Sequence, residues 1–105
     1  MASSQVINSG SIAVTTGQQL IPTGQLPRGG YLHLVAVSAQ GAATGTITVY
    51  DSQQTSGAPS GTVLATVQVP TTWSDRIDFW GALQFNKGLY VVVAGTGAIG
   101  QISWE

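Results

Sequence analysis

Few residues in this sequence could do acid–base or metal chemistry, and they are scattered. There is one histidine, His33, and there is no cysteine. His33 lies inside an apolar run, which favours a hydrogen-bonded structural role, because a metal ligand or a nucleophile's partner needs further groups beside it. The closest approach to a carboxylate pair is Asp75 with Asp78. Because an odd spacing in a strand puts side chains on opposite faces, these two acids cannot share a water, and we interpret them as salt-linked to Arg76 in a loop.

The sequence also gives no good evidence for a metal site or a nucleotide site. Calcium needs more oxygen ligands than Asp51, Asp75 and Asp78 provide. Residues 95–100 (GTGAIG) match the glycine pattern of dinucleotide-binding loops. That pattern must open a helix and be followed by an acid about 20 residues later, whereas this chain has five residues left. We therefore interpret the segment as a hairpin turn and predict no enzyme activity, no cofactor and no metal.

The aromatic residues could bind either a sugar or another protein. Exposed rings on a β-sandwich can stack on sugars, so a glycan is one candidate ligand. Few charged or amide groups accompany these rings to bind sugar hydroxyls, and tryptophan is enriched at protein interfaces, so we favour packing against protein. The candidate interface residues are Val6, Ile7, Trp73, Ile77, Trp80 and Trp104.

The low charge content argues against two further classes of function, nucleic-acid binding and membrane binding. Charged residues make up 7% of the chain and the net charge is -1, against about 25% charged residues in an ordinary domain. A nucleic-acid binder needs several Lys or Arg on one face, and an anionic membrane needs a polybasic patch; three cations supply neither. A surface with so little charge lacks self-repulsion and suits a permanent protein assembly.

The elements that must position these residues are all strands. Residues 88–95 are apolar throughout and predict a strand buried on both faces, around which the rest gathers. Residues 31–39 predict a central strand with Leu32, Leu34 and Ala36 on one face. Residues 46–51 alternate cleanly, with Ile47 and Val49 inward, and we expect these two strands to form an antiparallel hairpin.

The remaining segments complete the pattern. In residues 62–69, the side chains on one face are Val63, Ala65, Val67 and Val69. Residues 71–81 and 83–85 predict two further short strands, and residues 51–61 predict an exposed, mobile loop. Residues 1–10 are either a frayed terminus or an arm that pairs with a neighbouring subunit. About eight short strands and no helical period predict one all-β domain over residues 1–105, an antiparallel β-sandwich or jelly roll. We find no targeting segment and no membrane span.

The succession of motifs resembles small virion proteins of tailed bacteriophages. The resemblance covers residues 29–105 and is carried by residues 46–51 (TITVYD), a Gly- and Ser-rich loop, 61–66 (GTVLAT), 78–79 (DF), 87–92 (KGLYVV) and 95–98 (GTGA) before a final alternating strand. These are strand and turn patterns, so no catalytic residue transfers.

This resemblance implies a β-sandwich that decorates a capsid as a cement protein. Its partners would be capsid protein and copies of itself, in a homotrimer, and its location the virion after synthesis in the host cytoplasm. Residues 1–28 and 71–81 would touch neighbours. Two alternatives stay open: a carbohydrate-binding module, which would expose two or three aromatics on one plane, and a tail-fibre or pilin-like subunit, which would polymerise by strand donation.

Overall fold

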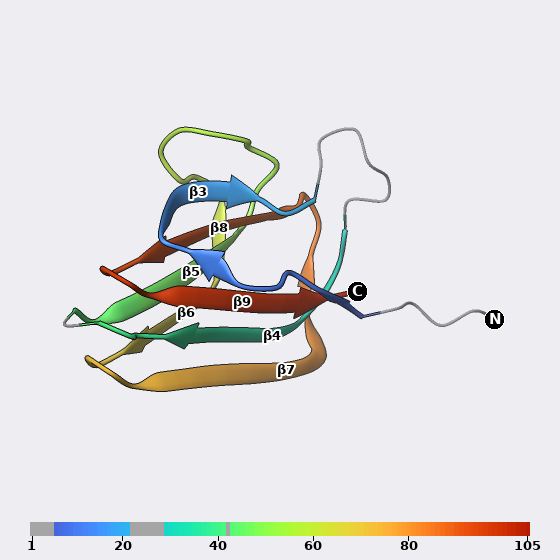
Figure 1. Cartoon of the computed structure of the whole chain (residues 1–105). Helices are drawn as coiled ribbons and strands as arrows, with labels where there is room; N and C mark the ends of the chain where they lie inside the picture. Colours follow the sequence, from blue (N-terminus) through green and yellow to red (C-terminus); the bar gives the residue numbers. More distant parts are fainter. Residues whose placement is uncertain (1–5, 22–28, 42) are drawn as a thin grey trace.

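The chain folds as two antiparallel sheets packed face to face (Figure 1). The computed structural model describes residues 6–21, 29–41 and 43–105. The first sheet has the order β1-β9-β4-β7, with β2 also paired to β9, and the second has the order β3-β8-β5-β6. The strands are β1 (Ile7–Asn8), β2 (Ile12–Ala13), β3 (Thr15–Gln19), β4 (Gly30–Ser38), β5 (Gly45–Asp51), β6 (Thr62–Val69), β7 (Ser74–Phe85), β8 (Leu89–Ala94) and β9 (Ile99–Trp104). The all-β sandwich is therefore confirmed.

Strand β8 is buried on both faces, as its apolar run predicts. Leu89, Val91 and Val93 are at most 1% exposed and face the sandwich core. Tyr90, also 1% exposed, lies on the other face, where its hydroxyl donates a 3.1 Å hydrogen bond to the carbonyl of Gly57 in the long loop. β8 pairs with β3 on one side and β5 on the other, so it is central in its sheet.

The long polar loop after β5 is held by its own glutamine. Gln54 Nε2 donates to the carbonyls of Ser56 and Ala58, and its Oε1 accepts from the Ser60 amide at 2.7 Å. Gln19, from β3, donates to the carbonyls of Ser52 and Gln54 at 2.8 Å each. The loop is thus exposed, as predicted, yet cross-linked by side-chain hydrogen bonds, and it forms the cover over Tyr90.

The predicted placement of Leu32, Leu34 and Ala36 on one face of β4 is wrong. The pairing of β4 with both neighbours shifts between Leu32 and Leu34, which marks a bulge. A bulge inserts one residue and reverses which side chains face the core. The core consequently takes Leu32, Val35 and Val37, while Leu34 and Ala36 face outward. The central position of β4, between β9 and β7, is confirmed.

The two hairpins expected from the sequence are also wrong. β4 and β5 follow each other along the chain but lie in different sheets, and so do β8 and β9. Each short connection crosses from one sheet to the other at the same end of the sandwich (Figure 1). Gly95, at a φ of 108°, provides the turn in the second crossing, closed by a 2.9 Å bond from the Ala98 amide to the Gly95 carbonyl.

Two details of the later strands differ from expectation. Val63 is 53% exposed, because the β5–β6 pairing shifts between Val49 and Tyr50 and turns Val63 away from the face that Ala65 and Val67 share. Residues 74–85 form one long strand, β7, instead of two short ones. Its pairing with β4 is interrupted near Trp80, whose φ is 54°.

Candidate functional site

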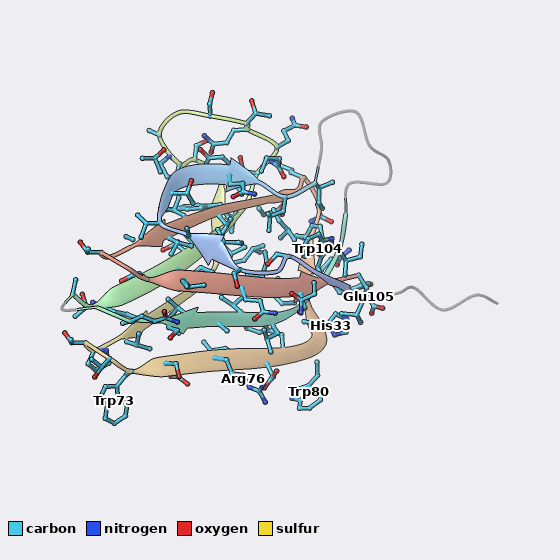
Figure 2. The ribbon with its side chains drawn as sticks, viewed as in Figure 1. His33, Trp73, Arg76, Trp80, Trp104 and Glu105 are labelled. Carbon is cyan, nitrogen blue, oxygen red and sulfur yellow. The ribbon has the colours of Figure 1, made fainter. Side chains whose placement is uncertain are left out.

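The single histidine lies next to Glu105, at the C-terminal end of β9. His33 lies at the β4 bulge, and its Nε2 is 2.9 Å from Glu105 Oε1, at an angle that does not make a hydrogen bond. Beside it, Tyr31 and Glu105 exchange backbone hydrogen bonds of 2.9 and 3.0 Å. The contact fixes the end of β9 against β4 and supports the structural interpretation of His33 (Figure 2).

Asp75, Arg76 and Asp78 lie in strand β7, not in a loop. Asp78 Oδ2 is 3.4 Å from Arg76 Nε, and Asp75 Oδ1 accepts the backbone N–H of Arg76 at 2.8 Å. Asp75 is paired with Val37 and Asp78 with Leu34, so the two acids lie on opposite faces, as predicted. Within residues 6–21, 29–41 and 43–105, no three acids or histidines gather into a group that could hold a metal.

Asp51, the third acid considered for calcium, closes the turn before β8. Its Oδ1 accepts backbone N–H groups from Lys87 at 2.7 Å, Asn86 at 3.1 Å and Gly88 at 3.4 Å. Successive amides converging on one carboxylate form an anion-binding nest. The carboxylate oxygen that a cation would need is therefore already bonded to backbone N–H groups of the protein.

Replacing Asp51 with alanine is expected to lower the free energy of unfolding by about 2 kcal/mol, because charge-assisted hydrogen bonds are lost and backbone donors are left unpaired. Urea denaturation measures the change. Asp78→Ala is the control, since it removes an exposed ion pair worth at most about 1 kcal/mol. Equal effects of the two substitutions would contradict the role assigned to Asp51.

The exposed aromatic surface follows strand β7. Trp80 is 86% exposed, Trp73 is 65% exposed and Ile77 is 38% exposed. Figure 2 shows Trp73, Arg76 and Trp80 projecting from the same edge of the sandwich, on the side of β7 away from β4. We call residues 73–80 the β7 edge. β7 is the last strand of its sheet, so the β7 edge combines unburied indoles with a strand that has one paired side.

Two backbone conformations, one in the β7 edge and one in the residue before it, cost energy. Thr72 has a φ of 66° and Trp80 a φ of 54°, in the left-handed region that glycine tolerates and branched or bulky residues avoid. Each position costs on the order of 1 kcal/mol or more. Neither was signalled by the sequence, because both residues otherwise suit extended strands.

The other predicted interface residues divide into two groups. Val6 and Ile7 are 55% and 49% exposed, but Ile7 pairs with Trp104 of its own chain, so this part of the expected arm joins its own sheet. Residues 1–5 of the arm lie outside the described part. Trp104 is 9% exposed and belongs to the core; in its sheet it is paired with Ile7 of β1 on one side and Leu32 of β4 on the other. The expectation that Trp104 lies at an interface is therefore wrong; it ends a central strand, and its alternation was not enough to show which face is inward.

A shallow hollow lies beside the β7 edge. It encloses about 380 Å³ and is lined by outward-facing groups of β4, β7 and β9, including Ser38, Arg76 and Gln101. Its walls are mostly small residues, and it opens widely to solvent. We assign it no ligand.

Comparison with known proteins gives no match: no family model, no curated protein and no solved structure is similar to this chain. Among the residues that the structure describes, there is no helix long and apolar enough to span a membrane. The functional conclusion consequently depends on the geometry of the β7 edge.

Proposed function

We propose that this chain is a non-catalytic structural protein that attaches to other proteins through the β7 edge, and that it serves as a decoration subunit of a phage virion. The observation that carries the proposal is the exposure of Trp73 and Trp80, at 65% and 86%, directly before and within an edge strand. Burying these two indoles against a protein partner would gain a large hydrophobic free energy, because their apolar surface now lies in water.

Two other features support an assembly role. The chain has seven charged residues, so little charge must be desolvated when its surface is covered. The sandwich is also internally braced: Gln54 cross-links the long loop and Asp51 closes the turn before β8. A preformed rigid surface loses less conformational entropy on binding than a flexible one.

The test is incorporation into particles. Particles made by the organism that encodes the chain are banded in a density gradient after nuclease treatment, and the band is examined by mass spectrometry. The proposal expects the wild-type chain in the band at a fixed ratio to the main shell protein. It expects a Trp73→Ser, Trp80→Ser double variant to be depleted about tenfold or more, given the weight of central tryptophans in interfaces. A chain absent from every particle band would overturn the proposal.

Glycan binding is a second candidate, and one observation favours it. Arg76 and Asp78 lie between Trp73 and Trp80 along β7 and offer hydrogen-bonding groups next to the stacking surfaces. The two rings are seven residues apart, about 23 Å along an extended strand, which spans several sugars instead of one.

Titration with mixed neutral and acidic oligosaccharides at millimolar concentration is expected to leave tryptophan fluorescence unchanged, because the β7 edge has evolved to contact protein under our proposal. Two of the three tryptophans are exposed and would report binding. A saturable shift in emission that Trp80→Ser abolishes would instead support the carbohydrate-binding alternative. A tail-fibre or pilin-like subunit would show itself by forming open polymers in solution.

A further inference from the structure

The unpaired side of β7 offers a defined set of backbone groups. Ala39 donates its amide to the carbonyl of Trp73 at 2.8 Å, which fixes the direction of the Trp73 carbonyl toward β4. Backbone groups of successive residues alternate between the two sides of a strand. Asp75 and Ile77 therefore point their amides and carbonyls toward β4, whereas those of Arg76 and Asp78 point to the open side. The 2.8 Å bond from the Arg76 amide to the Asp75 side chain agrees with this, since that amide has no strand partner.

The charges of β7 are complementary to those of a second β7 in one register. Two copies that continue a single antiparallel sheet are related by a twofold axis, and residues opposite each other share a face. Their sequence numbers then differ by an even number. The charged residues of β7 are Asp75, Arg76 and Asp78. Arg76 can therefore oppose the Asp78 of a second copy but not its Asp75, and this pairing places Ile77 on the axis.

We infer that two copies of this chain pair through antiparallel β7 strands, with Ile77 facing Ile77 on the twofold axis and each Arg76 facing the partner's Asp78. This inference rests on the proposed function and specifies one of its contacts. Arg76 and the partner's Asp78 exchange two backbone hydrogen bonds, and the axis repeats them. Cross-strand opposite charges stabilise an antiparallel pair, whereas like charges destabilise it.

The ends of the paired segment fit the same register. Trp80 falls opposite the partner's Ser74 at each end of the paired segment, whereas the partner's Trp73, one residue further along, lies on the opposite face of the strand. The positive φ of Trp80 ends the regular strand there, which limits the pairing to residues 74–80. A twofold pair at this edge differs from the homotrimer that the family resemblance implies, which stays a prediction.

Asp75 regulates access to the edge. Its carboxylate caps the Arg76 amide, which must be released before that amide can bond a second strand. An acid that shields an edge amide is one way in which proteins restrain strand addition. Asp75→Ala is thus expected to tighten the pairing severalfold.

Engineered cysteines test the register, because the chain has no cysteine of its own. On the axis, Ile77→Cys brings two Cα atoms to about 4.5 Å, within the range that a disulfide spans. Asp75→Cys, on the same strand and face, leaves them about 14 Å apart. Under mild oxidation we expect a covalent dimer from the first variant and a monomer from the second. The inference is overturned if Ile77→Cys stays monomeric or if both variants cross-link equally.

A charge exchange provides an independent test with the cysteine-free chain. Arg76→Asp is expected to raise the dimer dissociation constant about 30-fold, because both cross-strand pairs become repulsive. The double variant Arg76→Asp, Asp78→Arg restores opposite charges across the axis and is expected to return the constant to within about threefold of wild type. Sedimentation equilibrium measures each value. A double variant as weak as the single one would contradict the pairing.

Failure of this inference is distinguishable from failure of the proposed function. Particle bands that contain the chain, with no Ile77→Cys cross-link, would leave the proposed function standing and reject the β7 pairing. A cross-linked dimer that enters no particle would reject the virion role and retain the pairing.

Discussion

Gly95→Ala is expected to destabilise the fold severely. Gly95 has a φ of 108°, and a Cβ built there would overlap the carbonyl oxygen of Thr44. The clash is with backbone at the crossing between the two sheets, where neither segment can yield without breaking strand pairing. We expect a loss of about 4 kcal/mol or more from a domain whose total stability is about 5–15 kcal/mol. Circular dichroism and urea denaturation measure it.

Gly57→Ala is the matched control. Gly57 also has a positive φ, 89°, but a Cβ there meets no atom within 4 Å. Its cost is limited to backbone strain, about 1 kcal/mol. If the two alanine variants lose equal stability, steric closure at the sheet crossing is not what requires Gly95.

Trp104→Ala is expected to lower the free energy of unfolding by about 3–5 kcal/mol, because it removes a large side chain from a closed core. Trp104 is 9% exposed and pairs with both Ile7 and Leu32 through its strand. Thermal and urea unfolding should show the loss at any protein concentration. The substitution tests whether this ring is a core residue and not the interface residue that its sequence position indicates.

Trp80→Gly is expected to act in the opposite sense. Glycine relieves the φ of 54° at this position and removes a side chain that is 86% exposed. At low protein concentration, the free energy of unfolding should rise by up to about 1 kcal/mol, while association of the chains weakens. If Trp80→Gly destabilises the monomer as much as Trp104→Ala, the separation of core and surface tryptophans is wrong.

The sequence was sufficient for the fold class and for the strand buried on both faces. Alternation in residues 46–51 correctly placed Ile47 and Val49 inward, because a regular strand has a fixed period. It was not sufficient for β4, where the bulge after Leu32 puts Leu34 and Ala36 on the other face from Leu32. A bulge changes the period by one residue and leaves no compositional mark when both faces are apolar.

The local sequence pattern also did not show which of the two sheets each strand joins. A short glycine-containing connection has the same composition in a hairpin and in a crossing between sheets, so β4–β5 and β8–β9 were both predicted as hairpins. For the candidate site, the sequence selected Trp73, Ile77 and Trp80 as interface residues; the structure exposes all three, and their contact with another protein stays a prediction. The sequence failed for Trp104, which the structure places in the core cluster with Leu32 and Phe85, residues distant from it in the sequence.

The central claim is that the β7 edge holds another protein, in the first instance a second copy. Light scattering of the wild-type chain over about 1–200 µM tests it most directly, a range that spans the affinity of a small interface. The account predicts a mass that rises from the 10.8 kDa of one chain to twice that value, and a Trp80→Gly variant that stays near one chain. A wild-type mass of one chain at every concentration would contradict it.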